Sequence, residues 1–314
     1  MNSDISTEGQ VLGIDVGWSE KSDTTGACVL RWDQSKITLD VHLVPTSFEQ
    51  RTKKLKEIVG SDKFEAVALD GPLRPGFGRI GEYRLGELIL TRRFSNLGYG
   101  KPGQSSSPNG LELNAHANLI AKSVIEAECV AHAKHEAAIH ELAIAEAFPT
   151  TFLAVMLDKA KRPSSKAKSD IFFEWLLGPN APCRHNPDRD RIADLITGLL
   201  PRRTLQTQLG SITNHEHRAA VICAITALCV ACRQYIAVGD SRNGYLIMPP
   251  LVEAGEAGTQ PWAFNAVVSN LNEIKDWEKE GLSQLPTSPH VISQSKEKVS
   301  NSDAAIEAIE CPKS

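Results

Sequence analysis

The chain has 314 residues, 41% hydrophobic and 23% charged, which is enough apolar material for one large domain or two small ones. Its net charge of −4 and pI near 6.2 argue against a protein held to DNA by a generally basic surface, but leave a local nucleic-acid site open. The sequence lacks an apolar run of the roughly 20 residues that a membrane span needs and a recognisable signal peptide, and its 7 cysteines are an odd number. We therefore expect a cytoplasmic protein with buried thiols and no membrane association.

Short apolar runs open the chain and predict strands. Three of them are separated by short turns, which favours an antiparallel meander over residues 10–17, 25–32 and 37–44. Ser47 can cap a helix that runs to Gly60, and a fourth strand follows over 64–70. These elements predict an α/β fold.

The middle of the chain is less regular. Glycine and proline are dense from residue 71 to residue 111, around a helical core at 82–94 and a long polar loop at 98–108. The later elements that we predict are a helix at 111–136, a strand at 141–148, short helices within 150–200, a buried helix at 215–236 and a strand at 245–248.

Composition divides the chain into three parts. Residues 1–9 are polar and predicted to be flexible, and residues 10–282 form one domain with an inserted loop and helix region at about 71–136. Residues 283–314 are rich in Ser, Lys and Glu, which cannot offset the entropy of ordering, so a disordered tail is expected.

Three of the predicted strands end in or next to a carboxylate: Asp15, Asp70 and Glu146. If the strands lie side by side, these acids meet at one edge of the sheet. Clustered carboxylates repel one another and are costly to bury unless a cation neutralises them. An all-oxygen site favours Mg²⁺ or Mn²⁺, so metal-dependent phosphodiester chemistry is the leading hypothesis.

Each acid also has an ordinary interpretation. Asp15 precedes Val16-Gly17, a tight turn that also occurs at the phosphate site of actin-like ATPases. Asp70 can initiate the turn at Gly71-Pro72, and Glu146 can face solvent from an edge strand that Pro149 ends. The joint pattern favours the metal site more than any one acid does.

Further candidates lie outside the strands. His215 and Glu216 follow Asn214 at the positive end of a helix, where they can complete a metal site; alternatively they form a capping cluster. Three basic side chains are candidates for phosphate binding or are simply solvated: Lys101 on the long loop, and Lys161 and Arg162 in the basic segment 159–168.

Four motifs in this order resemble bacterial predicted nucleases of the RNase H-like fold, catalogued as domain of unknown function 429. The motifs are Gly13-Ile14-Asp15-Val16-Gly17-Trp18, Ala68-Leu69-Asp70-Gly71-Pro72, Glu146-Ala147-Phe148-Pro149 and His215-Glu216-His217-Arg218-Ala219-Ala220. Segments at 223–228, 238–240 and 244–250 are similar to the C-terminal end of that family, so the resemblance covers residues from about 10 to 250.

The resemblance implies a mixed five-stranded sheet that opens with three antiparallel strands and is flanked by helices, with acids of the first and fourth strands in the metal site. Many relatives carry an aspartate early in the final helix, before an alanine. Here Arg218 precedes Ala219, so Glu216 or His215 would complete the site, and Arg218 could contact the scissile phosphate.

These observations predict a nuclease that uses two divalent ions on nucleic acid. Asp15 would bridge both ions, Asp70 and Glu146 would hold one each, and Glu216 or His215 would complete the second. Two alternatives remain: an inactive nucleic-acid-binding module of the same fold, and an actin-like phosphotransferase that uses Asp15 against ATP.

Overall fold

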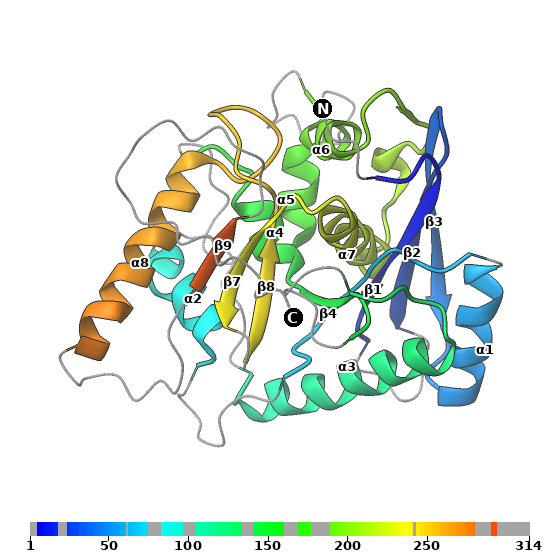
Figure 1. The fold of residues 1–314 in the computed structure, drawn as a ribbon, viewed down its shortest axis with the longest axis horizontal. Helices are drawn as coiled ribbons and strands as arrows, with labels where there is room; N and C mark the ends of the chain where they lie inside the picture. The colour runs from blue at the N-terminus through cyan, green and yellow to red at the C-terminus, as the bar shows by residue number, and fades with distance from the viewer. Residues whose placement is uncertain are drawn as a thin grey trace, which may run out of the picture.

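The computed structural model describes residues 5–17, 24–60, 62–74, 83–96, 105–133, 141–159, 169–177, 189–240, 243–279 and 290–293. These residues form an α/β fold in which helices flank one mixed sheet (Figure 1). The described strands follow the order β6-β3-β2-β1-β4-β5-β8-β7-β9. Their bounds are β1 Gly9–Asp15, β2 Thr25–Trp32, β3 Lys36–Val44, β4 Val67–Asp70, β5 Ile144–Ala147, β6 Thr204–Leu205, β7 Ile236–Asp240, β8 Gly244–Met248 and β9 His290–Ser293.

The first three strands form the predicted antiparallel meander. β1 pairs antiparallel with β2, and β2 pairs antiparallel with β3. β4 then adds parallel to β1 on its other side, and β5 adds parallel to β4. The carboxyl ends of β1, β4 and β5 therefore lie at the same edge of the sheet.

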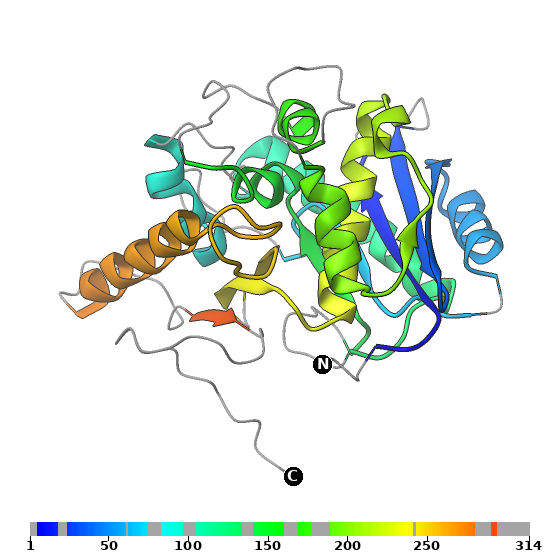
Figure 2. The same ribbon diagram turned by 90° about the horizontal axis from the view of Figure 1, so that it is seen from above.

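Helices cover both faces of the sheet. They are α1 Phe48–Val59, α2 Leu85–Asn96, α3 Pro108–Glu126, α4 Pro149–Ala154, α5 Ser169–Leu176, α6 Arg191–Leu199, α7 His215–Ala231 and α8 Pro261–Lys279. Figure 2 shows α7 and α1 on opposite sides of the blue strands. α7 packs on β1, β2 and β4, and α1 packs on α3, which contacts β4. Among the described residues, no helix is long and apolar enough to cross a membrane.

Two glycines allow α7 to pack directly on the sheet. A Cβ atom on Gly13 would overlap the backbone of Ala220 and Ala224, and one on Gly26 would overlap the carbonyl of Glu216. Because Gly26 is the cross-strand partner of Asp15, the first turn of α7 is held beside the end of β1. The two glycines thus fix where the polar start of α7 lies.

The predicted five-stranded sheet is too small, because β6, β7, β8 and β9 extend it beyond the first five strands. The helix predicted at 111–136 is α3, which ends at Glu126. The helix predicted at 215–236 ends at Ala231, Arg233 has a φ of 53°, and β7 begins at Ile236. Only two polar residues, Arg233 and Gln234, interrupt the apolar run at this break, and a helix often carries two such residues, so the pattern alone does not locate it. Helix α8 was also not predicted.

The expectation of a disordered tail from residue 283 is wrong for residues 290–293. They form β9, which pairs antiparallel with β7. The average composition of the tail does not predict this short strand. His290–Ser293 is ordered by backbone hydrogen bonds to β7, which composition does not record.

We expect β9 to contribute to stability. Removing residues 290–314 should lower the free energy of unfolding by about 1–2 kcal/mol, because the backbone bonds between β7 and β9 are lost. Removing only residues 294–314 should leave it unchanged, as their composition predicts. Urea denaturation of the two truncated proteins measures the difference, and equal stability would show that β9 contributes nothing.

Candidate functional site

Asp15 and Asp70 lie side by side at the ends of two neighbouring parallel strands. They are partners in the register between β1 and β4, so their side chains leave the same face of the sheet. That face is covered by α7, and both side chains are only partly exposed. Parallel pairing thus places two carboxylates together at the edge of the sheet, as the sequence predicted for these two acids.

Both carboxyls have raised pKa values. Burial, followed by the negative charge of Asp70, raises the pKa of Asp15 to about 8; His215 opposes this rise, while Glu216 and Asp170 add to it. Burial raises the pKa of Asp70 to about 7. At neutral pH the pair therefore holds at least part of a proton, unless a cation takes the place of that proton.

These pKa values predict how stability depends on pH. A carboxyl in the unfolded chain titrates near pH 4, so between about pH 4 and 8 the folded protein holds protons that the unfolded chain has released. Stability should fall as pH rises through this window, by about 1–2 kcal/mol after allowance for solvent screening. In Asp15→Asn the share of this loss that comes from Asp15 should disappear, while burial keeps the pKa of Asp70 raised. Denaturant titrations at pH 5 and pH 8 can show this, and an unchanged pH dependence would contradict the raised pKa of Asp15.

Three polar residues of α5 and α7 adjoin the pair. Asp170 in the first turn of α5 accepts a hydrogen bond from, or donates one to, the Nδ1 atom of His215 at 2.7 Å. Glu216 is the next residue of α7. Asp170, His215 and Glu216 all act on the pKa of Asp15, which places them in its electrostatic surroundings. The Oδ1 atom of Asp170 is buried and has no hydrogen-bond partner among the described residues.

The start of α7 also contains a side-chain cap. The side chain of Asn214 accepts a hydrogen bond from the backbone N–H of His217 at 3.1 Å. The helix therefore does not need Glu216 for its cap, and the carboxylate of Glu216 stands at the positive end of the helix near Asp15.

Arg218 is part of a buried network between α5 and α7. Its guanidinium donates to Glu174 at 2.9 Å and to the carbonyl of Ile212 at 2.8 Å, and lies 5.4 Å from the ring centroid of Phe173. Only 7% of Arg218 is exposed. Through these contacts Arg218 holds α5 against α7. Asp170, which belongs to α5, is thereby kept near the start of α7.

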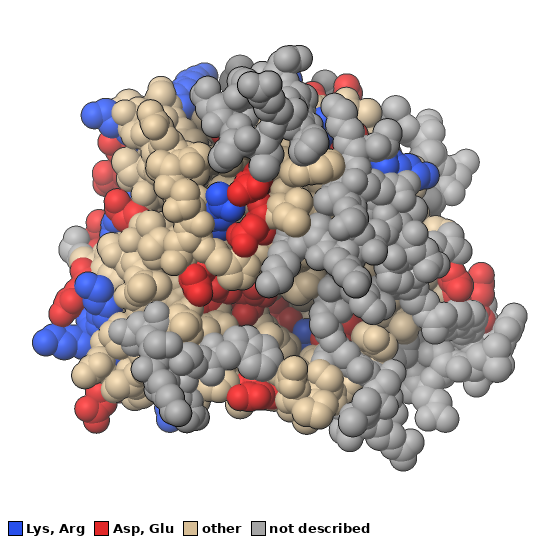
Figure 3. Space-filling view, turned by 180° about the vertical axis from the view of Figure 1, so that it is seen from behind, with Lys and Arg blue, Asp and Glu red and all other residues tan. Residues whose placement is uncertain are grey.

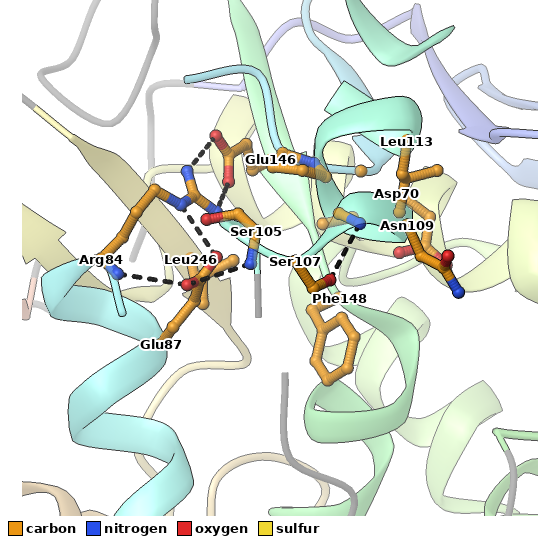
Figure 4. Close-up of a pocket in the computed structure, with 14 residues that line it drawn as sticks. Asp70, Arg84, Glu87, Ser105, Ser107, Asn109, Leu113, Glu146, Phe148 and Leu246 are labelled. Carbon is orange, nitrogen blue, oxygen red and sulfur yellow. Dashed lines mark hydrogen bonds and ion pairs between the residues drawn. The ribbon is translucent and has the colours of Figure 1, made fainter. Parts of the chain in front are cut away.

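Glu146 lies apart from the Asp15–Asp70 pair. Its register partner on β4 is Leu69, so its side chain leaves the opposite face of the sheet from Asp70. Both carboxylate oxygens accept bonds from Arg84, at 2.8 and 2.9 Å (Figure 4). The Oε1 atom also accepts a bond from the backbone N–H of Leu73. The structure thus brings together two of the three strand-end acids, and the third is held by a guanidinium.

Arg84 joins two buried carboxylates. Its Nε atom donates to Glu87 at 2.9 Å, and its Nη1 atom also donates to the carbonyl of Asn243 at 3.0 Å. Burial alone would lower the pKa of Arg84, but Glu146 and Glu87 raise it above the ordinary value. Arg84 is 4% exposed, Glu87 2% and Glu146 1%, so this is a buried ion network.

Four residues of the predicted motifs and basic segments lie outside the described residues. They are Lys101, Lys161, Arg162 and Trp18. The face in Figure 3 carries acidic side chains around a hollow at its centre. Within the described ranges, no group of three or more His, Cys, Asp or Glu side chains is arranged to hold a metal ion. A metal at Asp15 and Asp70 would therefore need ligands from water or substrate.

Two residues near the acids were missed by the sequence analysis. Asp170 resembles an ordinary acidic residue in the first turn of a helix, which is favoured there in any case. Arg84 lies in a glycine- and proline-rich stretch just before α2. The spacing Arg84-x-x-Glu87 is a weak signal, since charged pairs three residues apart are common on solvated helices.

Comparisons with known proteins assign no role to these residues. No protein-family model, no curated protein and no solved structure matches this chain.

Proposed function

We propose that the protein is a nuclease of RNase H-like fold that hydrolyses phosphodiester bonds at the Asp15–Asp70 pair with Mg²⁺ or Mn²⁺. The observation that carries the proposal is the pair itself: two carboxylates in register on neighbouring strands, with pKa values of about 8 and 7. Groups held in this way are stabilised by a proton or by a cation. Mg²⁺ is often bound by one or two carboxylates together with substrate phosphates, which fits a pair without a third protein ligand.

The arrangement of the sheet supports the RNase H-like assignment. Such proteins open with three antiparallel strands and take their acids from the first and fourth strands. Here β1, β2 and β3 form the meander, β4 lies parallel to β1, and the paired acids end β1 and β4. Because one fold supports many functions, the proposal rests on the acids more than on the sheet.

The protein's own residues have distinct roles in this proposal. Asp15 and Asp70 would hold the cation, and Glu216 and Asp170 would add negative charge close to it. When bound, a divalent ion would supply a lowered pKa for the attacking water and a charge that stabilises the leaving oxygen.

His215 can move the proton of the attacking water. Asp170 orients its ring through Nδ1, which leaves Nε2 to exchange a proton with solvent, since 51% of the His215 side chain is exposed. Glu146 and Arg218 maintain structure around the site, because each is itself buried and bonded to a side chain of opposite charge.

Calorimetric titration with Mn²⁺ and with ATP tests the proposal against its alternatives. We expect Mn²⁺ to bind without nucleotide, more tightly at pH 8 than at pH 6 because binding expels protons from the pair. Mn²⁺ should also support cleavage of an end-labelled oligonucleotide. Binding of ATP with the metal would favour a phosphotransferase, and binding of neither would favour an inactive binding module.

A further inference from the structure

A pocket of ≈ 260 Å³ opens at the carboxyl ends of β4 and β5. The starts of α2 and α3 form its walls, and Asp70 stands at its border, so the pocket adjoins the carboxylate pair. Figure 4 shows Arg84, Glu87 and Leu246 on one side, with Asp70, Asn109 and Leu113 on the other. A substrate group that enters this pocket would therefore lie next to a phosphate bound at Asp70.

The charges of the pocket exclude a phosphate as its occupant. Its acidic lining residues are Asp70, Glu87 and Glu146, and its one basic lining residue among those described is Arg84. The guanidinium of Arg84 already donates to both glutamates and to a backbone carbonyl. An anion here would meet unbalanced negative charge, so a neutral group fits better.

The uncharged lining suits a flat ring with polar edges. The half-buried ring of Phe148 and the side chains of Leu113 and Leu246 provide apolar surface. Ser105 is 2% exposed, and its buried hydroxyl has no hydrogen-bond partner among the described residues. Asn109 is exposed at the first turn of α3. A buried hydroxyl without a partner destabilises a protein, and a ligand that bonds to it removes that penalty.

We propose that this pocket binds a single unpaired nucleobase of the substrate strand, stacked on Phe148 with its polar edge at Ser105 and Asn109. This inference rests on the proposed nuclease function, because the base would belong to the nucleotide whose phosphate lies at Asp70. The volume of ≈ 260 Å³ is below the roughly 300–1,000 Å³ usual for drug-sized ligands, which favours one ring system over a whole nucleotide. Since a paired base cannot enter, the protein selects single-stranded or unpaired regions.

Fluorescence of 2-aminopurine tests the inference on the full chain in EDTA, where no cleavage occurs. The base is placed once in a single-stranded oligonucleotide and once, paired, in a duplex. We expect the protein to change its fluorescence in the single strand only. Ser105→Ala and Phe148→Leu should each weaken this binding about tenfold. Ser211→Ala and Phe264→Leu, which do not line the pocket, are the matched controls and should bind as the parent does.

Ser105→Ala should also have a characteristic effect on the melting temperature, so the inference can be tested even if Phe148→Leu folds poorly. Removing an unpartnered buried hydroxyl should leave the melting temperature of the free protein equal or higher while base binding falls. Unchanged base binding in Ser105→Ala would overturn the inference. So would binding of free adenosine or thymidine without binding of the oligonucleotide, because the ligand would then be a small molecule.

Failure of the inference can be separated from failure of the nuclease proposal. Asp15→Asn should lose Mn²⁺-dependent cleavage but keep the 2-aminopurine signal, because Asp15 does not line the pocket. Suppose that the protein cleaves no substrate with any metal, while the base still binds through Ser105 and Phe148. The base-binding inference is then supported, and the nuclease proposal is wrong. If Asp15→Asn alone abolishes cleavage and the pocket variants cleave and bind normally, the pocket is unused.

Discussion

Replacing Asp15 with asparagine is expected to lower Mn²⁺-dependent cleavage of a single-stranded oligonucleotide by about 10³-fold, because a metal contributes several kcal/mol to such reactions. Asparagine keeps the shape of the side chain but removes the charge that pairs with the cation. Asp70→Asn should have a similar effect, since the two carboxylates are register partners. Initial rates on an end-labelled substrate measure the loss, and calorimetry should show weaker Mn²⁺ binding in both variants.

Asp40→Asn is the matched control for these variants. Asp40 lies on β3, where its side chain is 53% exposed and pairs with Arg31 at 2.7 Å. Its replacement should leave the rate and the metal affinity as in the parent protein. Cleavage that stays within about tenfold of the parent in Asp15→Asn would place the reaction elsewhere or indicate a contaminating nuclease.

Replacing Arg84 with methionine is expected to destabilise the protein by about 3–5 kcal/mol. Methionine keeps most of the apolar stem but leaves Glu146 and Glu87, which are 1% and 2% exposed, without a counter-charge. For a domain of this size the melting temperature should fall by about 10 °C. Differential scanning calorimetry measures this fall.

Arg31→Met is the control for this variant, because its ion pair with Asp40 is exposed and worth less than about 1 kcal/mol. If both methionine variants lose the same stability, the buried network is not a major contributor.

Local sequence patterns predict the first half of the fold well. The runs that form β1, β2 and β3 are bounded by turns, and their short connections permit only antiparallel pairing between neighbours. β7 and β9 were missed for a different reason. Only the short polar pair Arg233-Gln234 separates α7 from β7, and β9 is ordered by pairing with β7, which no local pattern records.

The candidate site also contains residues that the sequence predicts and residues that it does not. Asp15 and Asp70 were predictable because each ends an apolar strand. The face on which Glu146 lies was not, because it depends on the register of β5 against β4, and a shift of one residue reverses the face. Asp170 comes from a separate helix, and the packing of α5 against α7 brings it to His215.

The bonds of Arg84 also bear on the order in which the protein folds. Arg84 is 62 residues from Glu146 and 159 residues from Asn243, so its guanidinium can be satisfied only after distant parts of the chain have met. Closing such loops is slow and entropically costly, so we expect these bonds to form late in folding. A contact formed after the transition state acts mainly on the rate of unfolding. We therefore expect Arg84 to govern how long the wall of the pocket persists once formed, rather than how fast the chain folds.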